Sequence, residues 1–249
     1  ASVAPLPAAL LDGLFEQPIE DIRITMSTHR APKNLNPNEI SGPDRQEILQ
    51  TWIRSGIEDF YLSFELENRW YRHSTFYCHQ GLEKICKTYH IGKYLKHLES
   101  FKAESALIQV DRVAKSLNHN LFKMVKCLQS RGILPTYTVS RPYSEDDLLQ
   151  GLEAAYTEVR YPVPHPFHLT KDQHGKERFR IPSATLKMYH DPLAETAPLK
   201  YARSMASALL KRIEAEFSVR IPDSKVSGKI SDKDWTRFTN IFFNSKAYD

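Results

Sequence analysis

The amino-acid sequence predicts a mainly α protein, an antiparallel helical bundle that carries a small β-hairpin insertion and an extended N-terminal arm. Apolar residues recur at spacings of three and four in several separate stretches, as they do on one face of an amphipathic helix. Two Ser-x-x-Asp sequences, which begin at Ser144 and Ser231, are capping boxes that mark helix starts. Hydrophobic residues make up 41% of the 249 residues, which is enough to bury one large core.

The chain is expected to have three parts. Residues 1–44 contain six prolines and little periodicity, so we expect an arm that lies over the core. Within it, apolar and polar residues alternate over residues 22–26, which indicates a short strand. Residues 45–217 are the helical bundle, with an insertion at residues 161–197. Residues 218–249 supply a linker and a short helix that docks on the bundle.

The first two helices are predicted at residues 52–71 and 77–90. The apolar face of the first is formed by Ile53, Ile57, Phe60 and Phe64. The apolar face of the second is formed by Cys78, Leu82, Ile85, Cys86 and Tyr89. Because the connection at residues 72–76 is short, the two helices must be antiparallel. The polar residues Glu83, Lys84 and Lys87 of the second helix are expected to face water.

The next segments are also helical. Apolar residues step by three or four from Leu107 to Leu128, which fits either one long helix or two. We favour two helices, with Asn118 capping the second, because Asn is a good N-cap and a poor helix-interior residue. A further helix follows Ser144 and must stop close to Pro162, which disfavours helical backbone before it.

The insertion and the C-terminal part follow. Residues 167–169 and 178–181 flank a polar run that contains Gly175, which predicts a β-hairpin. Because an isolated hairpin is only marginally stable, we expect its edge to pair with the strand at residues 22–26. A fifth helix has Pro198 in its first turn, where proline is tolerated. The short terminal helix is expected to dock through Trp235, Phe238, Ile241 and Phe242.

The composition limits which binding partners and which cellular compartment can be expected. A formal charge of +4 permits a nucleic-acid partner without establishing one. Cys78 and Cys86 are roughly 12 Å apart along a helix axis, too far for a disulfide, so we expect reduced thiols in a cytoplasmic protein. No apolar run approaches the length of a membrane span, and the first residues lack the features of a signal peptide. We therefore expect no membrane association.

Three motifs in chain order resemble those of the HEPN domain superfamily. The sequence His-Gln-x-x-Glu-Lys, which begins at His79, is similar to a motif in the first helical pair of that family. Asn-His-Asn-Leu, which begins at Asn118, resembles the start of its third core helix. Tyr-x-x-x-Arg-Tyr-Pro, which begins at Tyr156, is similar to the end of its fourth helix. Together with the following amphipathic helix, the resemblance covers about two thirds of the chain.

The resemblance implies a catalytic pair and a dimer. Arg160 and His165 enclose four residues, as in the Arg-x4-6-His pattern of HEPN ribonucleases. Cleavage of RNA by its own 2′-hydroxyl needs a proton carrier with a pKa near neutrality and a permanent cation, which histidine and arginine supply. The implied reaction needs no metal and leaves a 2′,3′-cyclic phosphate. Two protomers are expected to juxtapose their motifs, which makes a homodimer.

Substrate contacts are expected from basic and aromatic residues near the pair, if they converge with it. These candidate substrate-binding residues are Lys84, Lys87, His119, Lys123 and Tyr161. His79 and His119 are also expected to make hydrogen bonds between helices. Because no cysteine lies near His165 and His174, and their spacing suits a hairpin, we expect no metal site and no cofactor.

A structural interpretation of the same pair remains open. Arg160 ends a helix, where the helix dipole favours a cation, and His165 lies between two prolines. Where some HEPN members have a tyrosine two residues past the histidine, this chain has Phe167. The alternative function is a noncatalytic HEPN module that binds a nucleotide or a protein partner, such as a nucleotidyltransferase of a toxin–antitoxin pair.

Overall fold

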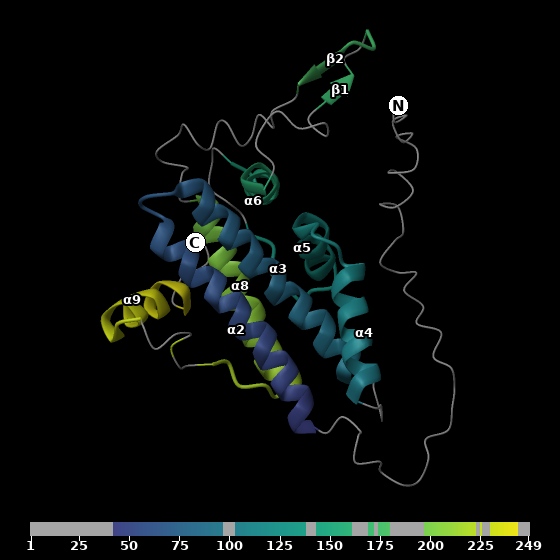
Figure 1. Ribbon diagram of the computed structural model, residues 1–249, viewed down its shortest axis with the longest axis vertical. Coiled ribbons are helices and arrows are strands. Elements are labelled where there is room, and N and C mark those ends of the chain that lie inside the picture. Colours follow the sequence, from purple (N-terminus) through teal and green to yellow (C-terminus); the bar gives the residue numbers. More distant parts are fainter. Residues whose placement is uncertain are drawn as a thin grey trace, which may run out of the picture. The chain divides into compact units, whose positions relative to one another are not determined.

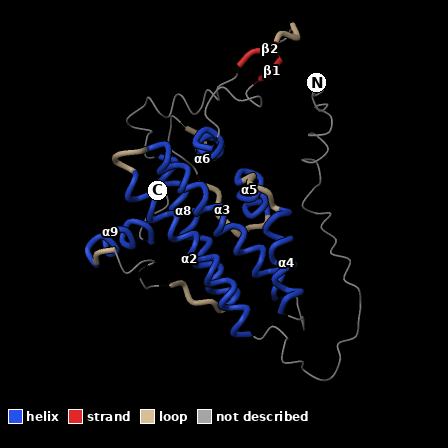
Figure 2. Tube along the Cα trace, in the orientation of Figure 1, coloured by secondary structure: helices blue, strands red, loops and turns tan. Residues whose placement is uncertain are grey.

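A computed structural model describes most of the chain from Gly42 onward (Figure 1). The described residues are 42–96, 103–137, 143–160, 169–171, 174–179, 197–222, 225 and 230–243. Within them the helices are α2 (Gly42–Leu66), α3 (Tyr71–Lys96), α4 (Ala103–Ser116), α5 (Leu121–Ser130), α6 (Glu145–Arg160), α8 (Ala197–Phe217) and α9 (Asp232–Phe243). Helices dominate this part of the chain, as Figure 2 shows, which confirms the mainly α prediction. The expected arm and its strand lie outside the described residues.

Helix α3 is the central helix of the bundle. It packs against α2, α4, α5, α6 and α8, and Figure 1 shows α2 and α8 running alongside it. The predicted connection between α2 and α3 at residues 72–76 is wrong, because the chain turns at residues 67–70 and residues 72–76 are already helical. Trp70 bonds to both helices. Its N–H donates to the Leu66 carbonyl at the end of α2 (2.8 Å), and its carbonyl accepts from the Ser74 N–H in the first turn of α3 (2.9 Å). No glycine or proline marks this turn in the sequence.

Glycines allow α2 and α3 to approach closely. Gly56 of α2 and Gly81 of α3 face each other beside Phe60, whose ring is fully buried. A Cβ atom at Gly81 would lie 2.7 Å from a ring carbon of Phe60 and 2.9 Å from the carbonyl oxygen of Gly56. The Phe60 ring in turn contacts Phe242 of α9, with centroids 4.8 Å apart. The backbones of α2 and α3 therefore leave no room for a side chain at Gly81.

The structure separates α4 from α5, as the sequence predicts, but the N-cap is a different asparagine. Asn118 has a φ of 51°, in the left-handed region that asparagine tolerates better than most residues. Asn120 is the N-cap, and its Oδ1 accepts a hydrogen bond from the Lys123 N–H at 2.8 Å. The sequence Asn-His-Asn thus supplies both the turn and the cap.

The capping box at Ser144 is confirmed, and at Ser231 the bond from the Asp234 N–H is confirmed. At the start of α6 the Ser144 N–H donates to Asp147 Oδ2 (2.8 Å), and the Asp147 N–H donates to Ser144 Oγ (3.2 Å). At the start of α9 the Asp234 N–H donates to the Oγ of Ser231 (3.1 Å). Helix α9 buries its aromatic residues as expected, but Ile241 is 39% exposed, so its predicted docking role is wrong.

The strands β1 (Leu169–Lys171) and β2 (Glu177–Phe179) pair in antiparallel register, with Leu169 opposite Phe179. Gly175 lies between them with a φ of 74°, which suits a turn glycine. The strands overlap the predicted ones but begin or end elsewhere. That this hairpin is an insertion into a HEPN bundle stays a prediction.

The structure also bears on the expected reduced cysteines and on the expected absence of a membrane-spanning segment. All three cysteines are free; Cys78 and Cys86 are buried, and burial raises the pKa of the Cys78 thiol to about 12. Among the described helices, none combines the length and the apolar composition that a membrane crossing requires.

The close contact at Gly81 gives the first prediction. Gly81→Ala should lower the free energy of unfolding by about 1–3 kcal/mol, because the new methyl overlaps a core ring and a backbone oxygen. Urea denaturation measures the change. The control is Gly56→Ala, whose Cβ meets the Ile85 side chain at 2.7 Å and a backbone atom, the Gly81 carbonyl oxygen, only at 3.2 Å. A Gly81→Ala protein as stable as Gly56→Ala would contradict this packing.

Candidate functional site

The three motifs of the HEPN resemblance meet on one side of α3. His79 of α3 is fully buried, and its ring stacks on Tyr156 of α6, with centroids 4.6 Å apart. His119, in the turn before α5, also stacks on Tyr156, at 5.5 Å. These contacts join residues that are 77 and 37 positions apart in the chain. The predicted hydrogen bond between helices is confirmed for His119, whose Nδ1 bonds Glu83 of α3, and is wrong for His79, whose contact with α6 is ring stacking.

A buried carboxylate lies at the centre of this group. Glu83 Oε1 accepts from His119 Nδ1 at 3.0 Å and lies 2.7 Å from Lys87 Nζ. The side chains of Glu83 and Lys87 are only 5% and 7% exposed, so the prediction that they face water is wrong. The reason is tertiary, because α5 and α6 pack against α3 and cover its polar side. An ionised carboxylate only accepts hydrogen bonds, so His119 Nδ1 is the donor, and in the neutral imidazole Nε2 is then the acceptor.

Glu153 of α6 completes the group and supports α5. Its Oε1 accepts the Phe122 N–H at 2.9 Å, at the start of α5, where a carboxylate is favoured by the helix dipole. Its Oε2 lies 3.5 Å from His79 Nε2. His79 Nε2 and Glu83 Oε2 are buried and make no hydrogen bond. We call His79, Glu83, Lys87, His119, Glu153 and Tyr156 the Glu83 cluster.

The remaining predicted site residues have separate positions. Lys84 lies 2.6 Å from Asp59 Oδ2 and donates to Ser55 Oγ at 2.9 Å, so its amine is held against α2. Burial raises the pKa of Asp59, although Lys84 acts in the opposite direction. Lys123 is exposed on α5. The structure thus places Lys84 in an ion pair with α2 rather than in the Glu83 cluster.

The proposed catalytic pair is described only in part. Arg160 is the last residue of α6, four residues and about one helical turn after Tyr156. Tyr161 and His165 lie outside the described residues. Tyr156 of the Glu83 cluster therefore lies one turn before the residue that the motif assigns to the phosphate.

Glu153 is the member of this cluster that sequence reasoning missed. It lies three residues before Tyr156, so both share one side of α6. Its position one turn before the motif tyrosine is the sequence signal that could have identified Glu153 as a site residue. The sequence analysis also missed Arg203 of α8. It follows Ala202 of the apolar face and is only 3% exposed, although arginine is usually exposed.

Chemically, the Glu83 cluster offers an oriented imidazole. The His119 side chain is 57% exposed, and its Nδ1 is fixed by a carboxylate, which leaves Nε2 as its proton acceptor. In the described part of the chain, no group of three histidine, cysteine or acidic side chains is arranged to hold a metal ion.

No protein-family model matches the chain, and no curated protein or solved structure is significantly similar to it. The geometry defines a helical-bundle protein with a buried cluster of histidine, glutamate and lysine. The HEPN resemblance rests on the three motifs themselves.

The burial of Glu83 gives the second prediction. Glu83→Gln should lower the free energy of unfolding by about 3–5 kcal/mol, because it leaves the Lys87 ammonium buried without its counter-charge. The measurement is equilibrium denaturation in urea.

The matched control has the same spacing but lies in water. Asp111 and Lys115 of α4 form an i,i+4 pair, also at 2.7 Å, with side chains 58% and 76% exposed. Asp111→Asn should change the free energy of unfolding by less than about 1 kcal/mol. Equal losses for the two variants would show that burial of Glu83 does not matter.

Proposed function

We propose that the protein is a HEPN-type RNA-binding protein that cleaves RNA without a metal ion, with Arg160 and His165 as its catalytic residues. The observation that carries this proposal is the convergence of the three motifs in the Glu83 cluster. Chance matches in sequence have no reason to pack against one another. Here His79, His119 and Tyr156 form one stack, and α6 then ends at Arg160.

The reaction follows from the chemistry of RNA. A base takes the proton of the 2′-hydroxyl, the 2′-oxygen attacks the adjacent phosphorus, and the bond from phosphorus to the 5′-oxygen breaks. The leaving oxygen takes up a proton, so the products are a 2′,3′-cyclic phosphate and a 5′-hydroxyl. His165 moves protons, and the guanidinium of Arg160 stabilises the added negative charge on the phosphate.

The Glu83 cluster has a supporting role in this proposal. Lys84 and Lys87 each lie within 2.7 Å of a carboxylate oxygen, so we assign them to positioning rather than to phosphate contacts. His119 and Lys123 are exposed at the start of α5, and we assign phosphate binding to them, with His119 in its protonated form so that Nε2 can donate. The resemblance further implies that two protomers share the site, so the proposal includes a homodimer.

The third prediction tests catalysis. Purified protein incubated with mixed RNA in excess chelator should cleave it and leave 2′,3′-cyclic phosphate ends, identified by mass spectrometry. His165→Ala should lower the rate by roughly 10²- to 10⁴-fold, the usual contribution of a general acid or base.

The control variant is His73→Ala, which removes a solvent-exposed histidine near the start of α3. It should cleave like the parent. Intact RNA after incubation with the parent would contradict the proposed nuclease activity. RNA that is bound but not cleaved would favour the noncatalytic module. Equal cleavage by the parent and His165→Ala would show that His165 is not a catalytic residue.

A further inference from the structure

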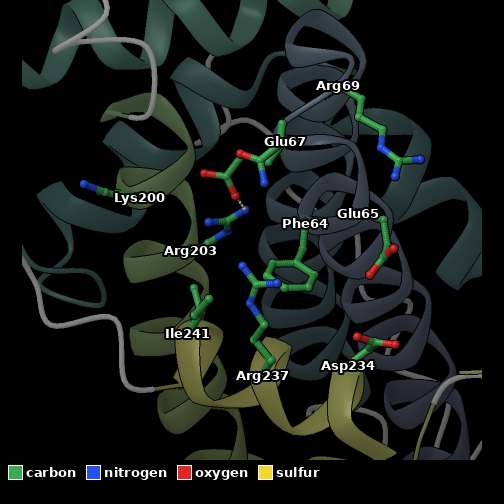
Figure 3. A pocket seen from close by; sticks show the side chains of 10 residues that line it. Phe64, Glu65, Glu67, Arg69, Lys200, Arg203, Asp234, Arg237 and Ile241 are labelled. Atoms are coloured by element: carbon green, nitrogen blue, oxygen red, sulfur yellow. Dashed lines mark hydrogen bonds and ion pairs between the residues drawn. The ribbon is translucent and has the colours of Figure 1, made fainter. Parts of the chain in front are cut away.

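A cavity of about 470 Å³ lies where the end of α2 and the turn after it meet α8 and α9 (Figure 3). This volume is in the range of small-molecule sites. Its lining is rich in charged side chains and comes from three helices and a turn. The lining residues are Phe64, Glu65, Glu67, Asn68, Arg69, Lys200, Arg203, Asp234, Arg237 and Ile241. We call this space the Arg203 cavity.

Arg203 is buried with unused hydrogen-bonding capacity. Its side chain is 4% exposed, and its Nη2 donates to Glu67 Oε2 at 2.7 Å. Its Nε is buried and has no hydrogen-bond partner. A guanidinium has five N–H donors, and removing it from water costs several kcal/mol unless those donors are satisfied. One partly exposed carboxylate satisfies this arginine only in part.

The other two carboxylates of the lining are used elsewhere. Glu65 accepts a hydrogen bond from the hydroxyl of Tyr61. Asp234 belongs to the capping box of α9 and accepts from Ser231 Oγ at 2.5 Å. In the view of Figure 3, Glu65 and Asp234 lie on the other side of Phe64 from Arg203. The part of the cavity around Arg203 therefore has one carboxylate, that of Glu67.

A second guanidinium enters the same space. Arg237 of α9 lies over the ring of Phe64, 5.3 Å from its centroid, a cation–π contact that holds the side chain against α2. Figure 3 shows Arg203 and Arg237 reaching into the cavity from α8 and α9. Near Arg203, two guanidinium groups face one carboxylate; over the whole lining, four cationic side chains face three carboxylates, which leaves a surplus of one positive charge. Planar guanidinium groups bind carboxylate and phosphate oxygens in pairs of hydrogen bonds.

We propose that the Arg203 cavity binds a small anion that carries phosphate or carboxylate groups, held by Arg203 and Arg237. A purely structural role, in which Arg203 only ties α8 to the turn after α2 through Glu67, does not need Arg237. The two interpretations therefore differ in what Arg237 does. The inference is independent of the proposed RNA cleavage, since it uses other residues.

The test is isothermal titration calorimetry of the full chain with two probes, inorganic pyrophosphate and citrate, at constant ionic strength. At least one probe should bind with a Kd below about 1 mM, and the probe that binds more tightly identifies the phosphate or the carboxylate class. Arg237→Gln should weaken that binding roughly tenfold, because it removes a charge-assisted contact.

Two further variants complete the test. Ile241→Glu, at a partly exposed position of the lining, adds a repelling carboxylate and should weaken binding at least as much as Arg237→Gln. Lys211→Gln removes one positive charge from an exposed position of α8 outside the lining and should bind like the parent. The absence of heat with both probes would overturn the proposal. Equal weakening by Lys211→Gln and Arg237→Gln would also overturn it, because the effect would then reflect net charge alone.

Discussion

The carboxylate of Glu83 lies inside the bundle, bonded to His119 at 3.0 Å and next to Lys87 at 2.7 Å. A buried charge is tolerated only where partners compensate it, and removing one partner leaves the other charge uncompensated. One partner lies on α3 itself and the other in the turn before α5. The position of α5 on α3 is therefore set by polar geometry as well as by apolar packing. Tyr156 of α6 joins the same arrangement by stacking on His79 and His119.

Helix α3 separates two kinds of contact. Toward α2 it presents Gly81, which lets the backbones approach and places Phe60 in the core. Toward α5 and α6 it presents Glu83 and the residues around it. The polar side specifies which residues of α5 and α6 meet. This division places Tyr156, one helical turn before the end of α6, in the Glu83 cluster. At the Arg203 cavity the positive side chains outnumber the carboxylates. We propose that a small anion from solution compensates the remaining positive charge.

The sequence alone predicted the helices well because their signals are local. The capping box at Ser144, the break between α4 and α5, and the apolar faces all depend on residues close together in the chain. The turn between α2 and α3 lies earlier than predicted because residues 67–70 contain no glycine or proline, Asn68 alone is a weak turn signal, and Trp70 bonds to both helices. The sequence favours Asn118 as the cap although Asn120 takes that role, because two asparagines, each suited to a cap, stand two residues apart.

The candidate site was predictable only in its members, not in its arrangement. The motifs named His79, Glu83 and His119, but a helical period assigns a polar residue to solvent unless another element covers it. That cover is supplied by α5 and α6, which lie far along the chain. Burial of Lys87 and Arg203 is a tertiary property for the same reason, and no spacing in the sequence encodes it.

The most direct test of this account is a double-mutant cycle between Glu83 and His119. The free energy of unfolding is measured in urea for the parent, Glu83→Gln, His119→Gln and the double variant. A Glu83 carboxylate that ties α3 to α5 predicts a coupling energy of roughly 1–3 kcal/mol between the two residues. Losses that add to within about 0.5 kcal/mol would contradict the account, because independent residues cannot be the link that brings the motifs together.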